Sequence, residues 1–217
     1  MIVFQDVWKA FGAAPPIARG ISLALPSSLS LGLLGRNGAG KSTLLKLIAG
    51  TLPPDRGRIT APGPVSWPVG FQGAFHPDLT GAQNIRFVAR LYGVDTGALA
   101  RFVSDFAELG PAFHAPLRSY STGMRARLAF GASMALPFST YLIDEVTSVG
   151  DGAFRERASA LLKARLKAAG AIIVSHSMGQ IRDLCEAVAV LEEGQLLYFS
   201  SVEAGIAHHE RSLAAAS

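Results

Sequence analysis

The feature that most constrains the fold is a glycine-rich segment between an apolar run and a helical pattern. It lies in the stretch LLGRNGAGKSTLLKLIAG, from Leu33 to Gly50. From Gly35 to Ser42 the residues follow the spacing G-x-x-x-x-G-K-[ST]. Glycines let backbone N–H groups turn inward around phosphate oxygens, and a helix beginning at Lys41 adds a partial charge of roughly +0.5 at its N-terminus. The segment therefore predicts a phosphate-binding loop between a strand and a helix. A purely structural Gly-rich turn is the alternative.

The composition describes a globular chain of ordinary domain size. Its 217 residues are 49% hydrophobic and 17% charged, which is enough apolar material for a full core. The mean hydropathy of +0.31 fits either an apolar docking surface or simply many Ala and Leu residues. The longest uncharged helix-like run, Leu128 to Ile143, contains Pro137 and is shorter than the ~20 residues that a membrane span needs. We therefore expect neither a membrane-spanning helix nor a signal peptide.

The cysteine content and the charge indicate the cellular compartment and the kind of partner to expect. Cys185 is alone, which excludes an internal disulfide and fits a reducing compartment. The net charge is +4 and the pI about 9.5, but the Lys and Arg residues are scattered along the chain. We interpret this charge as a solvated surface, and we expect no nucleic-acid partner.

Alternating strand and helix patterns around the loop predict an α/β fold. Apolar runs at residues 1–7, 21–25 and 29–34 predict strands, and residues 51–68 predict short strands and turns. Helical patterns at residues 81–92, 96–109 and 122–136 predict a helical subdomain at about 73–137, inserted in one domain of residues 1–217. We expect an N-terminal antiparallel β part and a mostly parallel core sheet with right-handed crossovers.

The last third of the chain returns to the strand–helix pattern. Predicted strands lie at residues 139–143 and 171–175, and predicted helices at 154–169 and 180–187. Residues 188–191 and 195–199 predict a hairpin. Ser200 and Glu203 have the spacing of a capping box and predict the start of the last helix.

Two acids follow the strand pattern Tyr141–Ile143 and suggest a metal and a base. Asp144 at the strand tip can hold Mg²⁺ through water, and Glu145 can orient and deprotonate an attacking water. In the loop, Lys41 is expected to bridge the β- and γ-phosphates and Ser42 to ligate Mg²⁺. An acid pair that merely caps the next helix is the alternative.

A histidine also falls at a strand end. His176 follows the predicted strand 171–175, and ligands bind at the carboxyl ends of strands in such sheets. A neutral imidazole there can donate to a γ-phosphate and sense its loss. His76, His114, His208 and His209 have no comparable neighbours in the sequence, and we assign them no role.

The segment YSTGMRARL, from Tyr120 to Leu128, distinguishes among nucleotide-binding proteins. It places Ser121 and Gly123 at a helix start, upstream of the acid pair. It resembles the signature motif of ABC-transporter ATPases, usually L-S-G-G-Q. In that family two domains dimerise head to tail, so the resemblance implies that Ser121 and Gly123 act in trans on the partner's γ-phosphate. An N-capped surface helix is the alternative.

The resemblance covers nearly the whole chain and implies further roles. Phe11 resembles the aromatic residue that stacks on adenine, and Gln72 the glutamine that touches Mg²⁺ and water. Asp151 ends Ser148–Asp151, which resembles the loop that crosses the dimer interface. In full, the resemblance implies nucleotide contacts by Phe11, Gly35, Asn37, Gly38, Ala39, Gly40, Lys41, Ser42, Thr43, Ser121, Gly123 and Asp151. It implies metal contacts by Ser42, Gln72 and Asp144, and catalytic roles for Lys41, Glu145 and His176.

Departures from the family pattern resemble the subgroup that exports bacterial polysaccharides. These are S-T-G-M in the signature, Val146 after Glu145, S-V-G-D in the interface loop, and the segment FHPDLTGAQNIRFVARLY from Phe75 to Tyr92. The resemblance implies an ATPase that uses ATP and Mg²⁺ to drive capsular polysaccharide across the inner membrane. It implies a homodimer, bound peripherally at the cytoplasmic side to integral membrane permease subunits. The alternatives are an O-antigen, teichoic acid or other glycan exporter, a soluble ABC ATPase acting on nucleic acid or ribosomes, and a small-molecule kinase.

Overall fold

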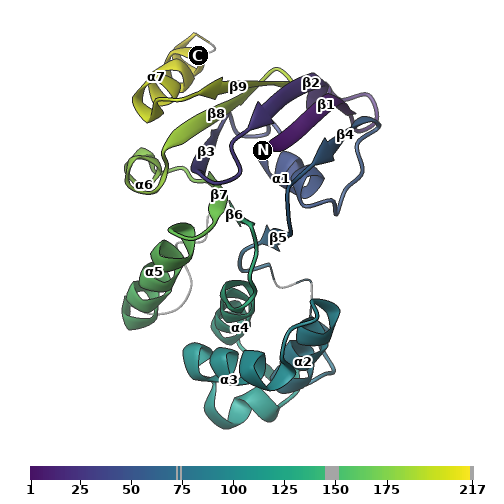
Figure 1. Cartoon of the computed structure of the whole chain (residues 1–217), viewed down its shortest axis with the longest axis vertical. Coiled ribbons are helices and arrows are strands. Elements are labelled where there is room, and N and C mark those ends of the chain that lie inside the picture. Colours follow the sequence, from purple (N-terminus) through teal and green to yellow (C-terminus); the bar gives the residue numbers. More distant parts are fainter. Residues whose placement is uncertain (72, 74, 145–151, 216–217) are drawn as a thin grey trace. The chain divides into compact units, whose positions relative to one another are not determined.

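The computed structural model describes residues 1–71, 73, 75–144 and 152–215 (Figure 1). The chain forms two compact units. The first comprises Met1–Pro68, Phe138–Glu145 and Leu166–Ser217, and the second comprises Val69–Pro137 and Val146–Arg165. The second unit thus contains more than the helical stretch 73–137 that the sequence suggested. The additional helix, Gly152–Leu166, packs within this unit. The centroid of its Phe154 ring lies 5.1 Å from that of Phe106.

The core of the first unit is a six-stranded sheet. Its order is β5 (Val65–Pro68), β6 (Thr140–Asp144), β7 (Gly170–Val174), β3 (Ser30–Leu34), β8 (Ala187–Glu192) and β9 (Gln195–Phe199). Neighbouring strands are parallel except β8 and β9, which confirms the predicted mostly parallel sheet. Strands β3 and β7 are buried at every position, as expected for apolar strands covered on both faces.

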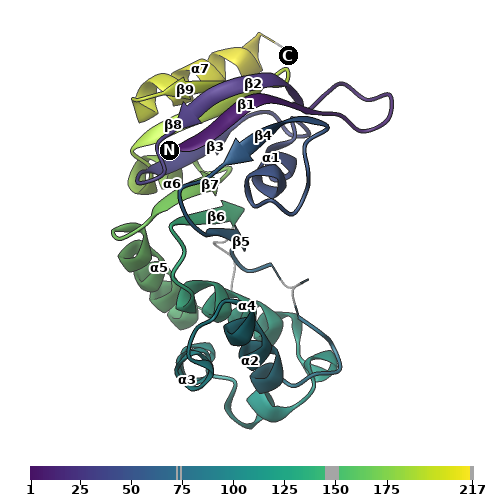
Figure 2. The same cartoon turned by 45° about the vertical axis from the view of Figure 1, so that its right-hand side comes forward.

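The predicted antiparallel part is a second sheet of three strands, β2 (Ala18–Leu25), β1 (Ile2–Lys9) and β4 (Arg56–Thr60). Although β2 and β3 follow each other in the chain, they belong to different sheets (Figure 2). One apolar cluster joins both sheets and helix α1 (Lys41–Ile48). Its members include Phe4 of β1, Leu33 of β3 and Leu44 of α1. Helix α1 begins at the lysine that the sequence indicated.

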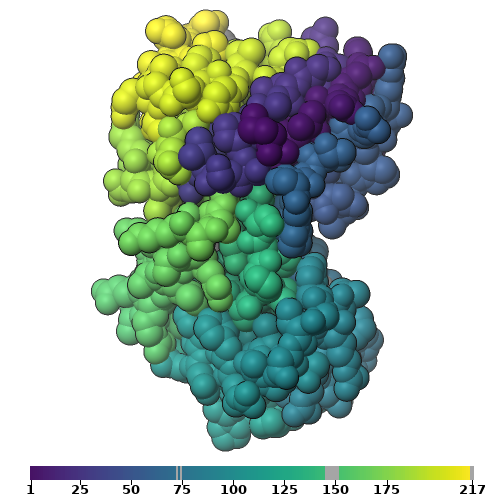
Figure 3. All heavy atoms as spheres, viewed as in Figure 1, coloured from purple at the N-terminus to yellow at the C-terminus, as the bar shows by residue number. Residues whose placement is uncertain are grey.

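The last strands and helices complete the first unit. The β8–β9 hairpin is confirmed, and its turn residues Glu193 and Gly194 both have positive φ, as in a two-residue type I′ turn. In Figure 3 the purple residues of the N-terminal strands lie against the yellow-green residues of this hairpin, and the backbone N–H of Arg19 donates to the Gly194 carbonyl at 2.8 Å. Strand β2 is therefore bonded directly to the turn of the last hairpin.

Two of these helices differ from the sequence predictions. Helix α6 spans Met178–Leu184 and is shorter than predicted, because Ser177 caps it earlier and Cys185 is already extended on the way into β8. Helix α7 spans Val202–Ala214, and its N-cap is Ser201, whose hydroxyl accepts from the Ala204 N–H. The predicted capping box was wrong. With the cap one residue later, Glu203 cannot reach back to close the box and instead pairs with Arg182.

The second unit is helical. It contains α2 (Gly81–Leu91), α3 (Thr96–Ala107), α4 (Thr122–Ala135), nearly all of α5 (Gly152–Leu166), and the short 3₁₀ helices η2 (Gly110–His114) and η3 (Leu117–Ser119). Phe106 of α3, Phe130 of α4 and Phe154 of α5 pack ring against ring in its interior. Among the described residues of either unit, no helix combines the length and apolar character needed to cross a membrane.

Candidate active site

Two glycines of the glycine-rich loop combine a positive φ with close packing against other segments. Gly40 has φ +100 and caps helix α1, and a Cβ there would lie 2.2 Å from Cγ2 of Ile17. Gly35 has φ +152, and a Cβ there would lie 2.5 Å from the carbonyl oxygen of Leu191. The loop is therefore packed against β8 at one end and Ile17 at the other. Its path is fixed by contacts as well as by φ.

Lys41 closes the loop from the inside. Its Nζ donates to the carbonyl oxygens of Gly35 at 2.7 Å and Arg36 at 3.1 Å. An ammonium group at the start of α1 adds its positive charge to the partial charge of the helix N-terminus. The combination attracts anions to the mouth of the loop.

Ser42 and Asp144 meet at the same place, although they come from different elements. The Ser42 hydroxyl, in the first turn of α1, donates to Oδ2 of Asp144 at 2.9 Å. Asp144 is the last residue of the otherwise buried strand β6. The parallel sheet brings the end of β6 beside the loop that follows β3, because both strands end at the same edge.

A cleft of about 510 Å³ opens beside this pair, and eight of the predicted residues line it. Ile17 and Val174 are its apolar members. The predicted residues in its lining are Asn37, Gly38, Gly40, Lys41, Ser42, Thr43, Asp144 and His176. The sequence therefore predicted most of one continuous surface from residues on three separate segments.

His176 enters the cleft from the carboxyl end of β7. The turn that carries it is held by Ser175, whose hydroxyl donates to Gln180 at 2.7 Å and accepts from the Ser177 N–H at 3.0 Å. A histidine side chain held by this turn can face a ligand at the sheet edge. The imidazole lies in the cleft together with Lys41 and Asp144.

The chemistry of the cleft fits a phosphate group with a hard divalent cation. Hydroxyl and carboxylate oxygens, here Ser42 and Asp144, are the ligands that Mg²⁺ accepts together with phosphate oxygens and water. Loop N–H groups and an ammonium suit the phosphates. A Gly-rich turn with a purely structural role would not require the acid and the hydroxyl to converge on the same spot.

Three predicted residues of the first unit lie elsewhere. Gly35 and Ala39 line a second cavity of about 270 Å³ behind the loop, next to helix α7. Phe11 follows β1 and is half exposed, with the Lys9 ammonium 5.3 Å from the centre of its ring. Phe11 is outside the lining of the cleft, and its exposed face leaves its predicted stacking role as an expectation.

The second cavity lies beside groups to which the sequence analysis assigned no role. Glu192 of β8 contacts His208 and Ser212 of α7, and the Ser212 hydroxyl bond, followed by His208, lowers the pKa of this carboxyl. Burial lowers the pKa of His209, and the charge of Lys41 acts in the same direction. His209 thus lies beside the glycine-rich loop, where these effects favour its neutral form. The helical pattern of residues around His209 does not indicate that this side chain lies beside the loop.

The signature residues belong to the second unit. Ser121 is the N-cap of α4, and its hydroxyl accepts from the Met124 N–H at 3.2 Å. Gly123 lies in the first turn of the helix, where a Cβ would meet only the Ser121 hydroxyl, at 3.9 Å. Within the described chain this glycine therefore has no steric role, although glycine costs a helix about 1 kcal/mol relative to alanine. Its absence of a side chain leaves the exposed helix start open to close approach.

Three predicted residues, Gln72, Glu145 and Asp151, lie outside the described residues. Two further residues escaped the sequence analysis. Ile17 contacts the loop and lines the cleft, and Asn84 is a buried amide in α2. An isolated Ile in a loop or an Asn in a helical pattern carries no distinctive sequence signal, because its role depends on segments distant in the chain.

Comparison with known proteins agrees with this geometry. A family model described as ABC transporter matches residues 18–148. The polysialic acid transport ATP-binding protein KpsT of Escherichia coli is 42% identical over 95% of each chain. The capsule polysaccharide export ATP-binding protein CtrD of Neisseria meningitidis serogroup B is 43% identical over 84% of this chain and 85% of its own.

More distant relatives and solved structures extend the comparison. The O-antigen export system ATP-binding protein RfbB of Klebsiella pneumoniae is 34% identical over 89% of this chain and 80% of its own. A dimeric ATP-binding cassette solved in a post-hydrolysis state with ADP and Pi superposes with a TM-score of 0.74 and 20% identity, covering 90% of this chain and 96% of that one. With the loop, the Ser42–Asp144 pair and the signature helix in place, these likenesses show that the chain belongs to the ABC transporter family of ATP-binding proteins.

Proposed function

We propose that this chain is the ATP-hydrolysing subunit of an exporter that drives capsular polysaccharide across the inner membrane. The observation that carries the ATPase part is the convergence of Lys41, the Ser42–Asp144 pair and His176 on one cleft. The substrate class is supported by the relatives, since two of them at 42–43% identity are described as transporting polysialic acid or exporting capsule polysaccharide.

In this proposal the loop N–H groups and Lys41 hold the phosphates of ATP. The Lys41 ammonium would exchange its two loop carbonyls for β- and γ-phosphate oxygens. Ser42 and Asp144 would hold Mg²⁺, directly or through water, and the Ser42 hydroxyl would give up its bond to Asp144. The chemistry that Mg²⁺ supplies when bound is neutralisation of charge on the phosphate oxygens.

The roles proposed for Glu145 and Gln72 rest on their positions in the sequence, and the role of His176 rests also on its place in the cleft. Glu145 directly follows Asp144, so its carboxylate would accept the proton of the attacking water. His176 would donate to the γ-phosphate, and its place in the cleft supports this role. Gln72 would touch Mg²⁺ and the water.

We further propose that two copies close head to tail around two ATP molecules. Ser121 and Gly123 would then contact the partner's γ-phosphate, where the N-terminus of the 14-residue helix α4 favours negative charge. The glycine without a steric role inside the chain supports an approach from outside. Asp151 would lie at the interface, and Phe11 would stack on adenine.

The proposed membrane partner is an integral permease, which contacts helix α2. The exposed side of α2 carries Phe87 and Leu91, 58% and 69% exposed and one helical turn apart. Arg86 and Arg90 are exposed on the same helix. Apolar side chains beside arginines are typical of protein interfaces. This surface supports a peripheral location at the cytoplasmic side of the inner membrane.

The proposal is tested by replacing Lys41 with Ala in the host cell and following the surface and internal glycans. Capsular polymer that disappears from the surface and accumulates inside the cell is the expected result. Loss of O-antigen with intact capsule would instead favour the second candidate, an O-antigen exporter, which the 34% identical relative supports. Unchanged glycans would contradict the export function.

A purified-protein experiment tests the ATPase part separately. The wild-type chain is expected to hydrolyse ATP only with Mg²⁺, and Glu145→Gln is expected to bind ATP, stop turnover and accumulate as a dimer. Normal turnover in that variant would contradict the role of Glu145. Stimulation by DNA rather than by a membrane partner would favour a soluble ABC ATPase.

A further inference from the structure

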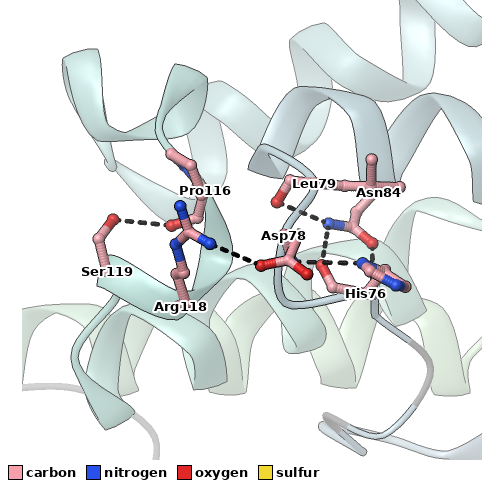
Figure 4. A network of polar contacts seen from close by, with 7 residues as sticks. All are labelled: His76, Asp78, Leu79, Asn84, Pro116, Arg118 and Ser119. Atoms are coloured by element: carbon pink, nitrogen blue, oxygen red, sulfur yellow. Dashed lines mark hydrogen bonds and ion pairs between the residues drawn. The ribbon is translucent and has the colours of Figure 1, made fainter.

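The amide of Asn84 organises the loop that precedes helix α2. Asn84 is 2% exposed, and its Oδ1 accepts from the backbone N–H of His76 at 2.8 Å. Its Nδ2 donates to the carbonyls of His76 and Leu79 at 3.1 and 3.2 Å (Figure 4). It also donates to the Thr80 carbonyl at 3.0 Å. Both ends of the amide are therefore used to hold one loop, residues 76–80. A buried amide with these partners is costly to replace.

Residues 76–80 in turn hold the segment that leads to the signature. The Leu117 N–H donates to the Leu79 carbonyl at 3.0 Å, and the Arg118 N–H donates to the Pro77 carbonyl at 2.8 Å. The Arg118 guanidinium also donates to Asp78 at 2.8 Å, across the gap between the two segments in Figure 4. We call this pair of segments, residues 76–80 and 116–120, the loop clamp.

The loop clamp ends directly at the signature. Tyr120 is buried, and its hydroxyl donates to the Ala112 carbonyl at 2.7 Å. The same hydroxyl would lie 2.4 Å from a Cβ at Gly81, the first residue of α2. The residue after Tyr120 is Ser121, the cap of α4. The position of Ser121 is thus set by α4 on one side and by the loop clamp on the other.

We propose that Asn84 is a positioning residue for the signature, acting through the loop clamp on Ser121. The inference rests on the proposed role of Ser121 in ATP-driven dimerisation. The Asp78–Arg118 pair, 61% and 70% exposed, links the two segments of the loop clamp, although an ion pair so exposed adds little to folding. What it can do is fix the direction in which the segment approaches α4.

The test measures ATP-driven dimerisation of the full-length chain in the Glu145→Gln background. Asn84→Leu keeps the volume of the side chain and removes its hydrogen bonds. We expect its dimer dissociation constant to rise about tenfold. This is the effect of losing one or two polar contacts between the two copies. Its affinity for ATP as a monomer is expected to stay within about twofold, since the phosphate loop belongs to the other unit.

Asp95→Ala is the matched control for stability. Asp95 caps helix α3 in the same unit by accepting from the Ala98 N–H, and it makes no contact with the loop clamp among the bonds of the described chain. Its loss is expected to lower the melting temperature without changing the dimer constant. If Asp95→Ala weakens the dimer as much as Asn84→Leu at equal loss of stability, the role of Asn84 is merely structural and the proposal fails.

A charge exchange keeps the test decisive if Asn84→Leu fails to fold. Asp78→Arg and Arg118→Asp, both at exposed positions, are each expected to weaken the dimer, and the double exchange is expected to restore it. No weakening in the single variants, or no rescue in the double, would overturn the proposal.

Ser121→Arg distinguishes a failure of the proposed signature function from a failure of the loop-clamp proposal. If it dimerises normally, the proposed function of the signature fails, and if it alone abolishes dimers, only the loop clamp is refuted.

Discussion

At the scale of the residue, the phosphate loop depends on two glycines that differ in their surroundings. Gly38 and Gly40 both have positive φ, at +82 and +100. Around a Cβ at Gly38 nothing lies within 4 Å, whereas a Cβ at Gly40 would overlap Ile17. The two positions therefore separate the cost of the backbone conformation from the cost of a steric clash.

Gly40→Ala is expected to destabilise the chain much more than Gly38→Ala. Gly38→Ala should cost about 1–2 kcal/mol, the strain of a left-handed residue with a side chain. At Gly40 the clash with Ile17 adds about 1–3 kcal/mol. Urea unfolding of the two variants measures the difference. Equal losses would show that Ile17 moves freely and does not fix the loop.

Cys185 gives a prediction that depends on pH. Burial raises the pKa of its thiol to about 12, from an ordinary value of 9.0, with Glu186 adding to the shift. Between these values the folded chain keeps a proton that the unfolded chain loses, so the free energy of unfolding falls as pH rises from 9 to 12. The fall is expected to shrink in Cys185→Ala. Rapid reaction of the native chain with a thiol reagent at neutral pH would contradict the burial.

The sequence alone predicts the roles of some single residues and not of others. Lys41, Ser42 and Asp144 follow motifs whose spacing reflects the geometry of phosphate and metal binding, so their meeting in one cleft was predictable. Asn84 was not, because its partners are backbone N–H and C=O groups, and a sequence does not show where these groups point. Ile17 likewise acts only through the shape of the loop beside it.

At the scale of the element, helix α7 packs on β8 at a glycine. A Cβ at Gly205 would lie 2.6 Å from Cβ and Cγ1 of Val188. Since the Val188 Cβ is fixed to the strand backbone, the helix itself would have to move. The glycine thus sets the distance between α7 and the sheet.

Gly205→Ala is expected to destabilise the chain by about 1–2 kcal/mol. Helix propensity favours alanine by about 1 kcal/mol, but the clash with Val188 costs more. Gly179 in α6 is the matched control, because a Cβ there meets nothing nearer than Ser177 at 3.7 Å. Gly179→Ala is expected to be neutral or stabilising. Thermal unfolding measures both, and stabilisation by both variants would contradict the close packing of α7.

Most elements could be located from the sequence, and the failures have physical causes. Apolar periodicity gave the strands and helices to within a few residues, since burial on one face or two leaves a repeating pattern. The start of α6 and the capping box of α7 were wrong, because neighbouring Ser residues compete for the cap position. The pairing of β2 with β1 rather than β3 depends on contacts that no local pattern contains.

At the scale of the whole molecule, the chain has two compact units. The proposed ATP site lies in the first unit, and the signature helix in the second. A ligand that binds only the folded state stabilises the part of the protein that forms its site. Nucleotide is therefore expected to affect the two units differently.

MgATP at 100 times its dissociation constant is expected to stabilise the first unit by about 2.7 kcal/mol. Hydrogen exchange of dilute Glu145→Gln protein should show added protection at residues 35–43 and none at 119–125. Raising the protein concentration should then protect 119–125 as dimers form. Lys41→Ala should show neither effect. Protection of both segments at every concentration would contradict a signature that acts in trans.

The first unit is discontinuous, and this has a consequence during synthesis. Among the described strands, β3 (Ser30–Leu34) pairs with β7 and β8, which are made more than a hundred residues later. At translation rates of 5–20 residues per second this wait is on the order of ten seconds. Throughout it, β3 lacks both neighbours in its sheet, whereas β1 and β2 can already pair with each other and with β4. Newborn chains are thus most exposed to aggregation before the last quarter is translated, and most dependent on chaperones there.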